Sequence, residues 1–194
     1  MADLRRVLGR AAAVAALLAG VVACSAAPSN QVAGAPRPDP ATTWSDTVCG
    51  SVLAFANAAT APPDFAAATD LAAVQRSYSA YLGALVAGVR EGRSALAAAG
   101  NPPVPDGYAV ADRVRTGLIR LEQDMTGAQA MVDGADPADP RGFVTAVRQV
   151  EQTVLAIEVP DVVAELATVP ELAAATRTAP TCRTVRTLAA AAPG

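Results

Sequence analysis

The feature that most constrains the fold is a long series of apolar residues spaced three and four apart. Its members are Leu71, Val74, Tyr78, Tyr81, Leu85, Val89, Gly92 and Leu96. This spacing places all of them on one face of an α-helix about seven turns long. Gly100 and Pro102 follow directly, and both residue types commonly end helices. The pattern therefore predicts a long amphipathic helix that has to bury this face against other helices.

Three further segments carry the same helical period. They span residues 44–55, 105–134 and 139–157, and shorter helical pieces follow after residue 160. Thr43 with Asp46, and Thr168 with Glu171, form Thr-x-x-acidic patterns that predict the starts of the first helix and of a late short one. No stretch shows sustained alternation with a period of two, so no strand is predicted. We expect an all-α fold, an antiparallel bundle of four main helices with short C-terminal helical segments, over residues 43–190.

The beginning of the chain has the composition of an export signal. Arg5, Arg6 and Arg10 precede residues 11–23, which carry no charged or polar side chain. This run is too short to span a bilayer comfortably, because a hydrocarbon core of about 30 Å needs about 20 apolar residues in a helix. A short apolar core that follows arginines and ends in small residues is typical of a cleaved signal peptide.

The sequence Val21-Val22-Ala23-Cys24 resembles the lipobox of bacterial lipoproteins. The resemblance implies that the Cys24 thiol receives a diacylglyceryl group, that residues 1–23 are removed, and that the protein is anchored on the extracytoplasmic face of the cell membrane. The alternative is an ordinary secretory signal in which Cys24 stands by chance. The chain is rich in Ala and has no Lys, which is similar to small lipoproteins of actinobacteria, and that likeness implies no activity.

A proline-rich segment separates Cys24 from the predicted bundle. Residues 25–42 contain four prolines and almost no large apolar side chain, so they cannot bury enough surface to become ordered. A flexible segment of this length reaches about 25 Å. We therefore expect three parts: a signal peptide at 1–23, the lipidated cysteine and its tether at 24–42, and the helical domain at 43–190.

Two cysteines remain for the folded domain. Cys49 lies in the first predicted helix and Cys182 lies near the C-terminus. Outside the cytoplasm such a pair is expected to form a disulfide. A catalytic or metal-binding use is the alternative, but no His and no second Cys lies beside either residue.

The residue types present exclude most enzyme chemistry. The chain has no His, which excludes Ser-His-Asp and Cys-His nucleophiles, Glu-x-x-His metal sites and imidazole ligands. Glu151, Glu158 and Glu165, spaced by seven, are expected on a solvated face, and Asp136 and Asp139 are expected to serve turns and helix caps. We expect surface salt bridges among residues 112–124 and core positions for the tyrosines. No catalytic residue, cofactor or metal is predicted.

Three hypotheses about function remain. Without residues 1–23 the chain has 12 arginines and 17 carboxylates, an acidic balance that argues against nucleic acid as a partner. The first hypothesis is a non-catalytic lipoprotein that presents a helical interaction or scaffold surface to a partner in the envelope. The second is a carrier of a lipid or apolar small molecule, suggested by small residues such as Gly83, Gly88 and Gly92. The third is an enzyme. A close-packed core favours the first hypothesis, whereas an open cavity of several hundred Å³ favours the second.

Overall fold

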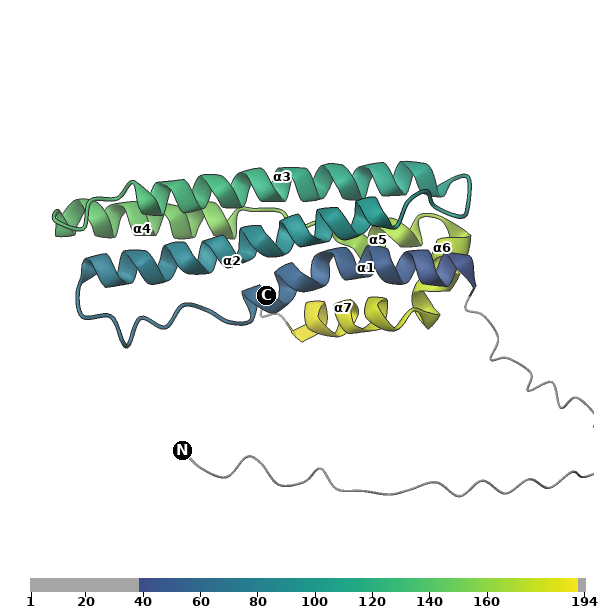
Figure 1. Cartoon of the computed structure of the whole chain (residues 1–194), viewed down its shortest axis with the longest axis horizontal. Coiled ribbons are helices and arrows are strands. Elements are labelled where there is room, and N and C mark those ends of the chain that lie inside the picture. Colours follow the sequence, from purple (N-terminus) through teal and green to yellow (C-terminus); the bar gives the residue numbers. More distant parts are fainter. Residues whose placement is uncertain (1–38, 192–194) are drawn as a thin grey trace, which may run out of the picture. The chain divides into compact units, whose positions relative to one another are not determined.

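A computed structural model describes residues 39–191, and in that range it contains seven helices and no strand. The all-α prediction is confirmed. Figure 1 shows the four longer helices running alternately up and down the long axis, followed by three shorter ones. The seven are α1 (Pro40–Ala59), α2 (Leu71–Ala98), α3 (Gly107–Asp133), α4 (Pro140–Leu155), α5 (Val162–Ala167), α6 (Pro170–Thr178) and α7 (Pro180–Ala191). The predicted signal peptide, Cys24 and most of the predicted tether lie outside the described residues.

Both predicted capping boxes are wrong. Helix α1 begins earlier than expected, because the Asp39 carboxylate accepts a hydrogen bond of 3.0 Å from the backbone N–H of Thr42, and Pro40 occupies the first turn. An Asp-Pro pair is a strong start signal, and it leaves Thr43 inside the helix. The Thr168 hydroxyl bonds back to the Glu165 carbonyl at 2.7 Å, so it serves the end of α5 and does not cap α6.

Glycines on α2 let the backbone of α1 approach directly. A Cβ atom added to Gly92 would lie 1.6 Å from the carbonyl oxygen of Ser51, and one added to Gly88 would lie 2.8 Å from the Phe55 nitrogen. These glycines are therefore contact points of two closely packed helices and leave no gap between them. The part of the carrier hypothesis that rested on Gly88 and Gly92 is not supported.

Helix α1 is shorter than its neighbours, and this divides the bundle into two halves. It has 20 residues, against 28 in α2 and 27 in α3. Figure 1 shows that α2 and α3 extend beyond the end of α1, and that α4 lies beside α3 at that end. At the opposite end α5, α6 and α7 pack around α1 instead. The C-terminal helices thus complete the core that α4 is too short to cover.

Candidate functional site

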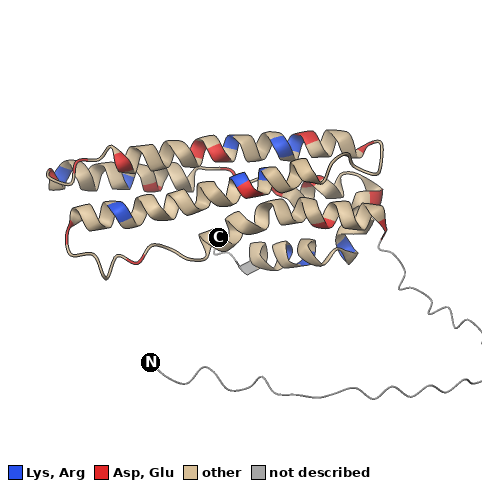
Figure 2. Ribbon diagram, viewed as in Figure 1, with Lys and Arg blue, Asp and Glu red and all other residues tan. Residues whose placement is uncertain are grey.

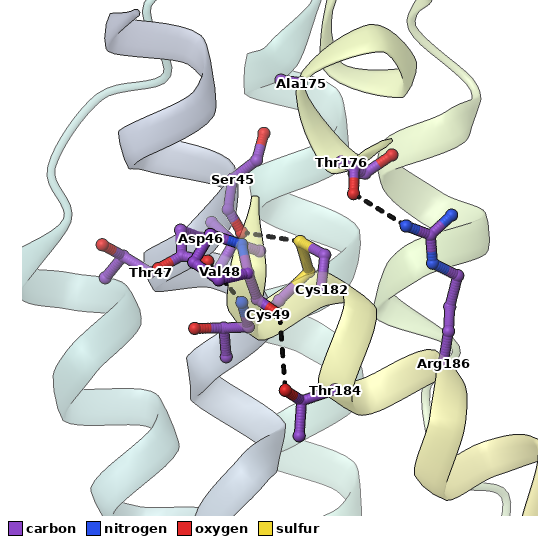
Figure 3. Close-up of a disulfide and its surroundings, with 12 residues drawn as sticks. Ser45, Asp46, Thr47, Val48, Cys49, Ala175, Thr176, Cys182, Thr184 and Arg186 are labelled. Atoms are coloured by element: carbon purple, nitrogen blue, oxygen red, sulfur yellow. Dashed lines mark hydrogen bonds between the residues drawn. A yellow bond between two sulfur atoms is a disulfide. The ribbon is translucent and has the colours of Figure 1, made fainter. Parts of the chain in front are cut away.

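A disulfide joins the first and last helices, as the sequence predicts. Cys49 on α1 and Cys182 on α7 are both fully buried, with a sulfur–sulfur distance of 2.06 Å and Cα atoms 5.0 Å apart. Figure 3 shows the bond in the interface between the two helices. The bridge closes a separation of 133 residues, so it ties the end of the domain to its beginning.

Two further contacts join the first half of α1 to the start of α7 and to the end of α6. The Asp46 carboxylate of α1 accepts a hydrogen bond of 2.7 Å from the backbone N–H of Thr181, which satisfies a donor in the first turn of α7. The hydroxyls of Thr42 and Thr178 lie 3.2 Å apart. Asp46 precedes Cys49 on α1, and their partners Thr181 and Cys182 follow in the same order on α7, so the two helices lie parallel, as Figure 1 shows.

Beyond the disulfide, α1 and α7 form the walls of an apolar groove. Its volume is about 630 Å³, and the segment that leads into α5 completes the lining. We call this the α1–α7 groove. Its apolar lining includes Val52, Phe55, Ala56, Ala59, Val159, Pro160, Val162, Val185, Leu188 and Ala189.

The groove offers almost no polar chemistry. Its other lining residues are Thr60 and Asp161, and the Asp161 carboxylate already accepts a hydrogen bond of 2.9 Å from the Ala164 N–H at the start of α5. Helix α1 has no charged residue after Asp46, and α7 has none after Arg186 (Figure 2). The lining therefore suits an uncharged apolar group and provides neither a nucleophile nor a set of metal ligands.

A wider depression between α3 and α4 has a more polar lining than the groove. Its volume is about 770 Å³, but Asp124, Gln149, Gln152 and Thr153 lie along it. Such a polar depression holds water as readily as a ligand. We therefore regard the α1–α7 groove as the candidate site.

The expected ion pairs are mostly replaced by pairs between helices. Glu165 was expected on a solvated face, but its carboxylate lies 2.6 Å from the Arg113 Nε and joins α5 to α3. Glu122 pairs across helices with Arg90, at 2.7 Å, and with Arg93. Hydrogen bonds from Arg90, which has the larger effect, and from Arg93 hold the pKa of Glu122 below its usual value. Helical spacing predicts contacts between residues three or four apart. Among residues 39–191, one ion pair, Arg115 with Asp112, has this spacing.

The tyrosines and aspartates behave partly as expected. Tyr78 is buried, Tyr81 is half-buried, and burial raises the pKa of both phenols. Tyr108 is 55% exposed and does not belong to the core, contrary to expectation. Asp136 serves a turn by accepting a hydrogen bond of 2.8 Å from the Ala138 N–H. Asp139 occupies the N-cap position of α4, but its carboxylate makes no capping hydrogen bond, contrary to expectation. None of these residues lines the groove.

The wall of the groove that α7 forms was not predicted from the sequence. Val185, Leu188 and Ala189 follow Cys182 at helical spacing, and that pattern was the available signal. Within residues 39–191 there is no cluster of residues able to hold a metal ion, and no helix is both long and apolar enough to cross a membrane. The chain matches no protein-family model, no curated protein and no solved structure.

Proposed function

We propose that this protein is a lipid-anchored, non-catalytic component of the cell envelope that holds a hydrocarbon chain in its α1–α7 groove. The observation that carries the proposal is an open groove of about 630 Å³ with an apolar, uncharged lining. Small-molecule sites have volumes of about 300–1,000 Å³ and are mostly apolar. Of the three hypotheses drawn from the sequence, an open apolar groove of this volume favours a carrier of a lipid or apolar small molecule.

The predicted anchor supports a lipid as the ligand. A tether that reaches about 25 Å from Cys24 keeps the domain close to the bilayer, which supplies hydrocarbon chains. The lining runs from Val52 on α1 to Thr60, the residue after the helix, over roughly 12 Å. Burial contributes about 0.8 kcal/mol per methylene, so a chain that inserts about eight methylenes gains about 6 kcal/mol before the cost of association. Such a ligand is bound reversibly, as a carrier requires.

A photoreactive fatty acid tests the proposal in isolated membranes that contain the protein. After illumination, mapped peptides should carry the label on the α1 and α7 residues of the groove. Ala56→Trp fills the groove and should abolish this labelling. Asn57→Trp is the matched control, because Asn57 is an exposed neighbour on α1 that does not line the groove. Equal labelling of the two variants, or no labelling of α1 and α7 in the unmodified protein, would exclude the groove as a lipid site.

An interaction role, the first hypothesis from the sequence, is supported by a different surface. Large apolar side chains on the outer side of α4 are exposed, and Leu155 is 86% accessible to solvent. Exposed apolar groups that share one helix face are a common feature of protein-binding surfaces. Helix α4 contributes nothing to the groove, so the two roles are structurally separate.

A further inference from the structure

The outer side of α4 carries a short stripe of apolar and charged residues. Val144, Arg148, Glu151 and Leu155 are separated by four, three and four residues, a spacing that places them on one face of the helix. Val144 is 49% exposed and Leu155 is 86% exposed. The buried residues of α4, Phe143 and Val150, lie on another side. Helix α4 therefore presents a second, unpartnered face, which we call the α4 stripe.

The α4 stripe is complementary to itself. When two copies are placed antiparallel, apolar residues face apolar residues and each charged residue faces one of opposite charge. If two α4 helices lie antiparallel about a twofold axis between residues 149 and 150, Val144 of one faces Leu155 of the other. In the same arrangement Arg148 faces Glu151 of the second copy, and each contact occurs twice by symmetry. The same axis also relates Arg141, in the first turn of α4, to Glu158, three residues beyond the end of the helix. Opposite charges thus meet in the centre, and apolar side chains meet on both sides of it.

The charges of the α4 stripe are available for this contact. Among the described residues, neither Arg148 nor Glu151 forms an ion pair within the chain, and both are exposed. A hollow of about 290 Å³ lies between this side of α4 and the first turns of α2. Leu71 and Val74 line it together with Val144 and Arg148, so a second helix placed here also gains apolar neighbours from α2.

We propose that two copies of this chain associate through an antiparallel pair of α4 stripes. In a twofold dimer the same surface of both copies meets, so that surface has to be self-complementary. Binding to a protein of another sequence does not require this property. Because the contact uses one helix of 16 residues and the edge of another, the interface is small and the dimer is weak in solution. Anchoring both copies to one membrane raises their effective concentration and favours the dimer there.

A charge-swap experiment tests the pairing in the full chain, extracted in a non-ionic detergent and analysed by sedimentation velocity over a range of concentrations. Each single variant, Arg148→Glu or Glu151→Arg, replaces two attractive pairs with two repulsive ones. We expect each to weaken dimerisation about tenfold, because two exposed pairs, each of which contributes modestly, change from attraction to repulsion. The double variant restores opposite charges and should recover the dimer. Arg120→Glu is the control, because Arg120 is exposed on α3.

Three results would overturn the proposal. They are a protein that stays monomeric at several hundred micromolar, single variants that dimerise as the unmodified protein does, and a double variant that fails to recover the dimer. Leu155→Ser provides a second perturbation that changes no charge, and it should also weaken the dimer. Because all these side chains are exposed, the thermal unfolding of each variant should match that of the unmodified chain, which separates loss of the dimer from loss of the fold.

Discussion

Replacing Gly92 with Ala tests the close packing of α1 on α2. The new methyl group would stand 1.6 Å from the Ser51 carbonyl oxygen, less than half of an ordinary contact distance, and the obstacle is backbone. The helices have to separate, which disturbs contacts along the whole interface. Overpacking costs up to about 3 kcal/mol, and the better helix propensity of Ala returns about 1 kcal/mol. We expect a net loss of about 2 kcal/mol in the free energy of unfolding, or roughly 4–8 °C in Tm.

Gly127→Ala is the matched control for this prediction. Gly127 lies inside α3, and an added Cβ would meet no atom within 4 Å. This variant gains the helix propensity without the collision, so its free energy of unfolding should rise by up to about 1 kcal/mol. Both variants are measured by urea unfolding followed by circular dichroism. If Gly92→Ala is as stable as the unmodified chain, or gains as much stability as Gly127→Ala, the direct backbone contact between α1 and α2 is wrong.

Three further predictions concern the disulfide, a salt bridge and the anchor. Cys49→Ser should lower the free energy of unfolding by up to about 5 kcal/mol, as reducing agent should in the unmodified protein, and thiol labelling of the non-reduced protein would contradict the bridge. The pKa of Glu122 is lowered by Arg90 and Arg93 from a usual value of 4.5, so its stabilising effect is present above that pH and is lost as the pH falls. Glu122→Gln should therefore lose less stability than the unmodified chain between about pH 5 and pH 3 in urea titrations, and equal losses would refute this role. Cys24→Ala should leave the precursor without its lipid, and an unchanged lipid mass on membrane-bound protein would exclude the anchor assignment.

Much of the fold follows from local signals in the sequence. Helices α2, α3 and α4 begin and end close to their predicted positions because Gly, Pro or a capping Asp stands at most of their ends. Gly100 has the positive φ of 67° that favours glycine after a helix. The disulfide was predictable because only two cysteines remain after Cys24. The early start of α1 was missed because Asp39 and Pro40 were assigned to the tether by composition.

The candidate site was less predictable because it depends on how distant segments pack. The period of α7 is visible in the sequence, but its parallel position beside α1 depends on the Asp46–Thr181 hydrogen bond and the disulfide together. The groove exists because α1 and α7 leave apolar surface open between them. The distance between two such helices cannot be predicted from the local sequence pattern of either one. For the same reason, the ion pairs of Glu122 and Glu165 were not predicted. Both residues pair with arginines on other helices, and spacing along one helix does not predict such contacts.

Native mass spectrometry of the protein, released gently from its own membranes, would show whether the α1–α7 groove holds a hydrocarbon chain. We expect a mature chain that begins at Cys24 and carries the anchor mass, together with a second, non-covalent mass that is lost on unfolding. That second mass should be absent from Ala56→Trp and present in Asn57→Trp. A protein that carries its anchor but no additional mass in any sample would contradict lipid binding in the α1–α7 groove.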